Sequence, residues 1–302
     1  MTMKWQGVMP AITTGFNPDL SIDHDFVAKH VTWLVDNGCT GIVTPGSLGE
    51  GNTMTFEERS AVWATVVKAV GERVPVVAAI SALSTAEAVE QAKTAAKQGC
   101  QGLMVLPPYV YQGDWREMKA HVAACFKATP LSCMLYNNPV AYGTDFVPEQ
   151  IQEQANEFEN FQAVKESSTD VRRVTAIKAL IGNRLDLFVG VDDAIVEAIP
   201  VGAVGWVAGL VNALPKESVD LFNYTMRGEM EKALPLYHWF LPLLRLDTVP
   251  KFVQLIKLVQ QEVGMGNTHV RSPRLKLVGA ELEQTRALIQ QQLAHIPQFP
   301  LR

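Results

Sequence analysis

The chain has 302 residues, of which 48% are hydrophobic and 19% are charged. This composition supplies a large core and excludes an intrinsically disordered, collagen-like or coiled-coil protein. With 26 Lys and Arg against 31 Asp and Glu, the net charge is −5 and no basic run is present, so we expect no nucleic-acid partner.

The cysteines and the apolar segments bear on the cellular location of the protein. Four cysteines are too few for a disulfide scaffold and form no Cys-x-x-Cys pair, so we expect reduced thiols and a cytoplasmic protein. The first ten residues contain no apolar run long enough for a signal peptide. Residues 198–215 carry no charge over 18 positions, which reaches the lower limit for a membrane span. Their three glycines and two prolines predict a buried strand with loops instead, so we expect no membrane partner.

Short apolar runs recur along the chain and are continuous rather than alternating, which is typical of strands buried on both faces. The runs occupy residues 7–14, 41–46, 75–81, 102–108, 132–137, 161–168, 186–193 and 202–209. Most of their starts are separated by the length of one strand-helix unit.

Amphipathic stretches between these runs predict helices. Capping-box patterns, Thr55 with Glu58 and Ser84 with Glu87, mark the starts of two of them. Further helices are predicted over residues 23–35, 117–126, 149–158 and 171–180. Strands that alternate with helices form a parallel sheet, and eight such units close best as a barrel. We therefore predict an α/β fold of the (β/α)8 TIM-barrel type, with an open doubly wound sheet as the alternative.

The last part of the chain has a different pattern. Residues 216–293 contain no strand-like run and are rich in Leu, Gln and Glu, which predicts a helical extension. No linker or low-complexity segment separates it from the rest. We expect a barrel that carries the active site over residues 1–215 and a C-terminal helical region over 216–302 that packs on it.

The active site of a parallel barrel lies at the carboxyl ends of its strands. Lys165 follows the apolar residues Ala163 and Val164 and is expected at the inner end of the sixth strand. Burial there disfavours the charged amine. A neutral amine can attack a carbonyl carbon and form a Schiff base. The alternative is a lysine that reaches solvent or pairs with Glu166.

Two further strand ends carry polar groups. Tyr136 ends the fifth strand, one repeat before Lys165. A phenol beside an imine can shuttle protons, which would give Tyr136 a catalytic role. The alternative is that Tyr136 is an aromatic residue of the core. Segment 46–51 (GSLGEG) follows the second strand, and its glycines allow backbone N–H groups to converge on an anion such as a carboxylate. The alternative for this segment is a plain strand-helix turn. It lacks the Lys of a nucleotide-binding loop.

Other titratable residues fit a site less well. The six histidines fall in predicted helices or in the helical tail without ligand spacing, so we expect no catalytic metal. Asp192 and Asp193 end the seventh strand, but adjacent residues of a strand point to opposite faces. At most one of the two can therefore line the mouth of the barrel, and we predict a capping role for this pair.

Segments 46–50 (GSLGE), 136–139 (YNNP) and 165–167 (KES) together resemble the dihydrodipicolinate synthase and N-acetylneuraminate lyase family. The resemblance covers nearly the whole chain. It implies a class I, Schiff-base-forming enzyme on a (β/α)8 barrel with a C-terminal helical region, usually a homotetramer. It also implies no cofactor besides the covalent imine with the lysine, and a small 2-oxo acid or imino acid as substrate.

The resemblance implies a role for each matching residue. Lys165 would form the imine, Tyr136 would be the proton shuttle, and Ser47 would belong to the proton relay. The backbone amides of Ser47 and Leu48 would hold the substrate carboxylate. Val207 matches the position whose carbonyl lies near the lysine.

The sequence departs from the synthases at two positions. Ala141 stands where the synthases carry an arginine that holds a second carboxylate. Val110 stands where they carry a tyrosine that reaches a neighbouring subunit, and Tyr109 or Tyr111 would have to substitute for it. Both departures count against a role in lysine biosynthesis.

Segments 136–145 and 165–168 look most like the branch of the family linked to hydroxyproline breakdown, the 1-pyrroline-4-hydroxy-2-carboxylate deaminases. That substrate has one carboxylate and yields 2,5-dioxopentanoate and ammonia. On this hypothesis Asn138 and Tyr142 hydrogen-bond the ring hydroxyl. The alternatives are a pyruvate aldolase or a 2-keto-3-deoxy sugar acid aldolase or dehydratase of the same family, and a protein that binds a keto acid without turnover.

Overall fold

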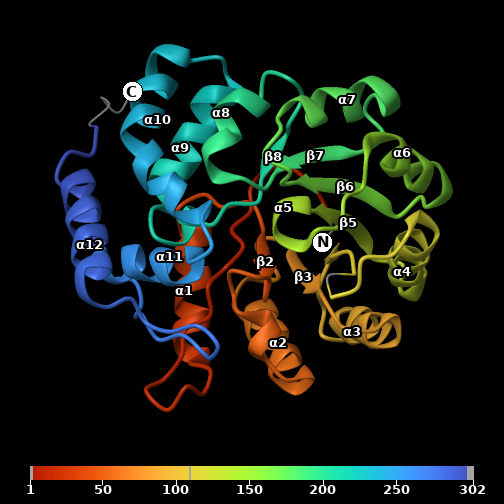
Figure 1. Cartoon of the computed structure of the whole chain (residues 1–302), viewed down its shortest axis with the longest axis horizontal. Helices are drawn as coiled ribbons and strands as arrows, with labels where there is room; N and C mark the ends of the chain where they lie inside the picture. Colours follow the sequence, from red (N-terminus) through yellow and green to blue (C-terminus); the bar gives the residue numbers. More distant parts are fainter. Residues whose placement is uncertain (1–2, 109, 298–302) are drawn as a thin grey trace.

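The computed structural model describes residues 3–108 and 110–297, in which eight strands form one parallel sheet (Figure 1). The strands are β1 (Gly7–Val8), β2 (Ile42–Thr44), β3 (Val76–Ile80), β4 (Gly102–Val105), β5 (Ser132–Asn137), β6 (Phe161–Glu166), β7 (Asp186–Val189) and β8 (Gly205–Trp206). Their order is β1-β8-β7-β6-β5-β4-β3-β2. A parallel bridge between Ala11 and Val43 joins the segment after β1 to β2 and closes the ring. The TIM-barrel prediction is confirmed, and the open-sheet alternative is wrong.

Helices follow the strands along the chain, and the longer ones cover the outside of the ring (Figure 1). They are α1 (His24–Asp36), α2 (Phe56–Val70), α3 (Thr85–Lys97), α4 (Trp115–Ala128), α5 (Pro139–Tyr142), α6 (Pro148–Glu157), α7 (Arg172–Ile181), α8 (Ile195–Ala198) and α9 (Pro215–Met226). The predicted capping boxes are present at the start of α2, where Thr55 and Glu58 bond reciprocally, and in part at α3, where Ser84 accepts the Glu87 N–H. The short helix α5 was not predicted.

The C-terminal region is helical, as predicted. It contains α10 (Met230–Leu244), α11 (Phe252–Glu262) and α12 (Gly279–Leu293); α10 packs on α9, and α12 packs on α10 and α11 (cyan to blue in Figure 1). A hydrogen bond between Gln260 on α11 and His30 on α1 anchors this region to the barrel. The division of the chain at residue 215 stays a prediction.

The uncharged segment 198–215 folds as expected, with the buried strand β8 between loops. Among the described residues, no helix combines the length and the apolar character that crossing a membrane requires.

Two apolar layers position the site. Side chains between the sheet and the helices form the larger layer. The inside of the barrel is filled by a second cluster, which comprises Trp5, Met9, Ala11, Val43, Val77, Ala79, Met104, Leu106, Met134, Tyr136, Ala163, Phe188 and Val207. Because strand residues alternate between faces, Lys165 shares the inner face with Ala163, two positions earlier.

A buried ion pair joins the glycine-rich segment 46–51 to the C-terminal region. The Lys257 amine on α11 lies 2.6 Å from the Glu50 carboxylate, and both side chains are almost inaccessible to solvent. The other Glu50 oxygen accepts the backbone N–H of Arg271 at 2.9 Å. The segment that follows β2 is therefore held from outside the barrel.

We predict that Lys257→Met destabilises the protein by about 3–5 kcal/mol, because it leaves a buried carboxylate without its counter-ion. Urea denaturation measures the change. Lys251→Met is the matched control, since Lys251 pairs with Glu281 on the surface and such pairs contribute less than about 1 kcal/mol. Equal losses in the two variants would contradict this account.

Candidate functional site

Lys165 and Tyr136 lie side by side at the carboxyl ends of β6 and β5. They are register partners in the parallel pair, and the Lys165 Nζ lies 4.0 Å from the centroid of the Tyr136 ring. Each residue is only 6% exposed. The juxtaposition expected from one repeat of sequence spacing is present in the fold.

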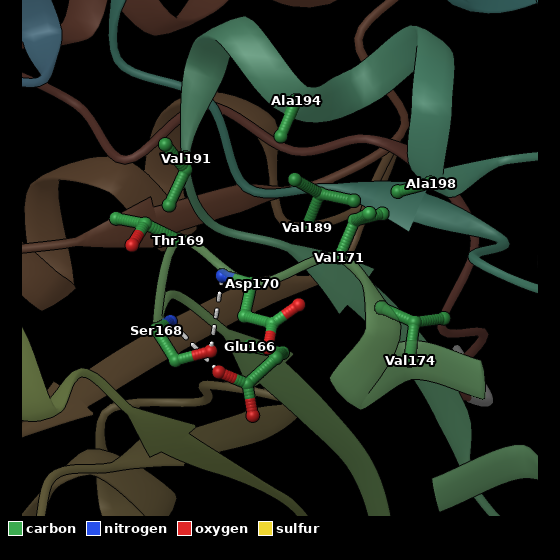
Figure 2. Close-up of a pocket in the computed structure, with 10 residues that line it drawn as sticks. All are labelled: Glu166, Ser168, Thr169, Asp170, Val171, Val174, Val189, Val191, Ala194 and Ala198. Atoms are coloured by element: carbon green, nitrogen blue, oxygen red, sulfur yellow. Dashed lines mark hydrogen bonds between the residues drawn. The ribbon is translucent and has the colours of Figure 1, made fainter. Parts of the chain in front are cut away.

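Glu166, next to Lys165 in sequence, does not pair with it. Figure 2 shows the Glu166 side chain in a pocket between β6, β7, α7 and α8, on the outer face of the sheet. Its carboxylate accepts the Ser168 N–H at 2.7 Å and the Asn137 Nδ2 at 3.2 Å, and lies 3.5 Å from Arg173 Nε. The alternative of a Lys165–Glu166 ion pair is therefore wrong.

Burial controls the charge of the Lys165 amine. It lowers the pKa of Lys165 from the ordinary 10.5 to about 8, against the opposite influence of the negative charges on Asp247 and Asp192. The shift favours the neutral amine by about 3 kcal/mol. No salt bridge to Lys165 is present among residues 3–108 and 110–297. About a tenth of the amine is therefore neutral and available as a nucleophile at pH 7, and about half at pH 8.

Further polar groups contact Tyr136, the neighbour of this amine, directly or through Tyr142. The Ser47 Oγ, after β2, hydrogen-bonds the Tyr142 hydroxyl on α5. The Tyr142 ring meets the Tyr136 ring edge-on, with centroids 5.8 Å apart. Asn138 Nδ2 donates to the Tyr136 hydroxyl at 2.9 Å. Burial raises the pKa of Tyr136, and the hydrogen bond from Asn138 opposes that rise.

Asn138 and Tyr142, the two residues expected to hydrogen-bond a substrate hydroxyl, lie beside the lysine and tyrosine pair. Here Asn138 contacts Tyr136 and Tyr142 contacts Ser47, and their role towards a substrate stays a prediction. Asn138 also caps α5 by accepting the Ala141 N–H at 3.0 Å. The side chains of Leu48 and Val207 are buried, and that of Val207 lies inside the barrel near Tyr136.

Gly190 makes room for the lysine. It follows β7, and a Cβ added there would overlap the Lys165 side chain and the Ser167 hydroxyl. The barrel therefore accommodates Lys165 on its inner face because the neighbouring strand ends without a side chain.

Two carboxylates act on Lys165 from outside the predicted site. Asp192 lies in the 3-10 turn η2 (Asp192–Ala194) rather than at the end of β7, and it accepts N–H bonds from Gly209 at 3.0 Å and Leu210 at 2.7 Å. Burial nevertheless raises its pKa to about 6, and its charge reaches Lys165. Asp193 instead points to Arg245, at 3.2 Å.

The second carboxylate, Asp247, was not predicted to belong to the site. It ends the turn η4 (Arg245–Asp247), after α10, so no strand-end pattern marks it. Burial, together with the charge of Asp192, raises its pKa well above the ordinary value. Only the folded chain brings it to the barrel mouth.

In the part of the chain that the structure describes, no cluster of three or more His, Cys, Asp or Glu side chains could hold a metal ion. Tyr111 is 60% exposed, and its hydroxyl donates to the Glu117 carboxylate, at 3.0 Å from Oε2. Tyr109, the other tyrosine considered for the relay, lies outside the described residues.

A buried lysine beside a tyrosine at the carboxyl end of a (β/α)8 barrel is the arrangement of a class I Schiff-base lyase. Residues 4–292 match the model of the dihydrodipicolinate synthetase family, so the chain belongs to this family and is an enzyme of the Schiff-base lyase class.

Curated relatives and solved structures agree with this assignment. The chain is 30% identical over 268 residues to a 4-hydroxy-tetrahydrodipicolinate synthase of Methanococcus maripaludis, covering 89% of this chain and 92% of the relative. It is 30% identical to that of Bartonella quintana, covering 96% and 97%. A dihydrodipicolinate synthase structure from Bacillus anthracis superposes with a TM-score of 0.92 at 29% identity, over 99% of this chain and 100% of the other.

Two of the similar structures are complexes with pyruvate. A prophage protein of the dihydrodipicolinic acid synthase family from E. coli K12, in complex with pyruvate, superposes with a TM-score of 0.90 at 25% identity. The match covers 96% of this chain and 99% of the other.

We predict that kcat/KM follows the deprotonation of Lys165. Since only the neutral amine attacks, kcat/KM should rise about 50-fold from pH 6 to pH 8 and level off above about pH 9. Steady-state kinetics across this range measure the profile. A rate that continues to rise tenfold per pH unit beyond pH 9 would indicate a lysine with an ordinary pKa.

Proposed function

We propose that the chain is a Schiff-base-forming deaminase that converts 1-pyrroline-4-hydroxy-2-carboxylate to 2,5-dioxopentanoate and ammonia, a step of hydroxyproline breakdown. The buried Lys165 amine over the Tyr136 ring carries the proposal. Ala141, in place of the arginine that the synthases use for a second carboxylate, favours a substrate with one carboxylate.

The loop after β2 binds that carboxylate through backbone amides. Neither the Ser47 nor the Leu48 amide has a hydrogen-bond acceptor among the described residues, so both can donate to an anion. The Glu50–Lys257 pair fixes this loop from behind. A carboxylate held here places C2 of the substrate close to the amine of Lys165.

Catalysis begins when Lys165 attacks C2 of the cyclic imine. The C2–N bond of the ring breaks, so the ring opens to an imine of Lys165 with a free amine on C5. The imine makes the C3 protons acidic, and Tyr136 takes part in their transfer. Loss of the C4 hydroxyl leaves a C3–C4 double bond conjugated to the imine. Transfer of a proton from C5, with protonation of C3 and C4, moves this unsaturation to C5 and turns the C5 amine into an imine. Hydrolysis of the imines at C2 and C5 then gives the products. One water leaves and two are consumed, so the balance is one water consumed for one ammonia released.

The proton relay comes from one chain in this proposal. Ser47, Tyr142 and Tyr136 supply its hydroxyls, supported by the Ser47–Tyr142 hydrogen bond and the edge-on contact of the two rings. Tyr111 bonds Glu117 and is largely exposed in the single chain, and the proposed relay does not include it.

The second candidate function is a pyruvate aldolase, or an aldolase or dehydratase of 2-keto-3-deoxy sugar acids. It uses the same lysine and tyrosine with a different pocket. The synthase names of the curated relatives and the pyruvate-bound structure from E. coli K12 favour it. The missing arginine disfavours the synthase reaction itself.

The proposed enzyme needs no metal, since a lysine imine supplies the electron sink. We place it in the cytoplasm, in keeping with four buried free thiols. We also propose a homotetramer. Exposed apolar side chains after three neighbouring strands support association near the barrel mouth: Leu83, Val110 and Val140.

A panel of pyrroline carboxylates and 2-oxo acids tests the function. We expect ammonia and 2,5-dioxopentanoate from 1-pyrroline-4-hydroxy-2-carboxylate with the wild-type chain. Lys165→Ala should lose at least about a thousandfold in kcat/KM, on the order of 4 kcal/mol of transition-state stabilisation. Lys216→Ala, at an exposed lysine, is the control. Turnover of the sugar-derived acids alone would replace the deaminase by the second candidate.

A further inference from the structure

Asp247 reaches the barrel mouth from the C-terminal region. Its carboxylate occupies the space beside Gly209 that a side chain would fill, because a Cβ added at Gly209 would overlap both carboxylate oxygens. Gly209 follows β8 and directly precedes the turn η3 (Leu210–Asn212). A carboxyl group from η4 thus takes the space that a side chain in the loop after β8 would fill.

Asp247, when it is ionised, acts on the groups that carry the chemistry. It raises the pKa of Lys165 more than Asp192 does, and it contributes to the raised pKa of Tyr136. The titratable groups that face it therefore come from β6, β5 and η2. Asp247 belongs to the same site as the lysine.

Asp192 and Asp247 differ in their partners. Asp192 accepts N–H bonds from Trp206, Gly209 and Leu210, which stabilise its ionised form. The Asp247 Oδ1 is buried and has no hydrogen-bond partner among the described residues. Two carboxylates in one buried site with such different surroundings take different protonation states. Asp247, whose buried Oδ1 accepts no hydrogen bond, is therefore the carboxyl group that keeps its proton. It can give that proton to a ligand.

We propose that Asp247 is the general acid that protonates the hydroxyl group leaving C4 of the Lys165-bound substrate. This inference rests on the proposed function and deepens it, since it gives the elimination step its own residue. It also selects for substrates that carry a hydroxyl on C4.

In the proposed step, Tyr136 accepts a proton from C3. The electron pair of that C–H bond forms the C2–C3 double bond of an enamine. The enamine reforms the imine, a C3–C4 double bond appears, and the C4–O bond breaks. The departing oxygen keeps the bonding pair, takes the proton of Asp247 and leaves as water. Transfer of the C3 proton from Tyr136 to Asp247 restores both groups, so one water is lost overall.

Two reactions separate this role from a general effect on the lysine. Exchange of the pyruvate methyl hydrogens with deuterium, followed by NMR, needs the Lys165 imine and proton transfer at C3, but pyruvate has no C4 hydroxyl. Ammonia release from 1-pyrroline-4-hydroxy-2-carboxylate needs both. For Asp247→Asn we expect exchange within about threefold of the wild type and ammonia release reduced at least about a hundredfold. Asp193→Asn, the control at a neighbouring acid that faces Arg245, should keep both rates.

Two results would overturn the assignment: ammonia release within threefold of the wild type in Asp247→Asn, or an equal loss of exchange and release in the folded variant. Circular dichroism verifies that the Asp247→Asn variant is folded. If it is not, Asp247→Ser is measured in its place. A wild-type chain that exchanges pyruvate but releases no ammonia refutes the proposed function separately. In that case the dehydration of a 2-keto-3-deoxy sugar acid, which also carries a C4 hydroxyl, replaces ammonia release. A loss of dehydration with pyruvate exchange retained in Asp247→Asn would then support the role of Asp247, and an unchanged dehydration rate would refute it.

Discussion

The chemistry of this protein depends on the burial of one amine. The interior of the barrel removes Lys165 from water, and the loss of hydration outweighs the attraction of two nearby carboxylates. If either carboxylate formed a direct ion pair with Lys165, the amine would stay protonated and could not attack. Asp192 is held instead by backbone and indole N–H groups, which keep its charge at the site without a salt bridge.

Space for the lysine comes from missing side chains. Gly190 at the end of β7 leaves room for Lys165, and Gly209 after β8 leaves room for the Asp247 carboxylate. The inner face of a TIM barrel is normally a packed core. At the carboxyl end of this barrel, glycines on two adjacent strands allow polar groups to enter. The apolar cluster below them, including Phe188 and Val207, excludes water from beneath.

The fold and the centre of the site were predictable from sequence because both follow from local periodicity. Continuous apolar runs predict parallel strands, and strand ends converge at one edge of a barrel, so Tyr136 and Lys165 are brought together by spacing alone. The side to which Glu166 points also follows from strand alternation. The proximity of Ser47 needs only the position of its loop after β2.

The remaining contacts depend on chain folding over long separations. Asp247 lies 82 residues after Lys165 in an irregular turn, and no periodicity marks it. The bond between Tyr142 and Ser47 requires the helix α5, a single turn that starts at Pro139 and that the apolar pattern does not indicate. The Glu50–Lys257 pair joins residues 207 positions apart. Such pairings are set by packing of the C-terminal helices, which local sequence does not specify.

The most direct measurement is borohydride reduction in the presence of pyruvate, followed by peptide mass spectrometry. The account predicts one stable adduct on the peptide that contains Lys165 and an unmodified Lys257, although both lysines are buried. An adduct on another lysine, or none on Lys165 at pH 8, would contradict the claim that this amine is the nucleophile.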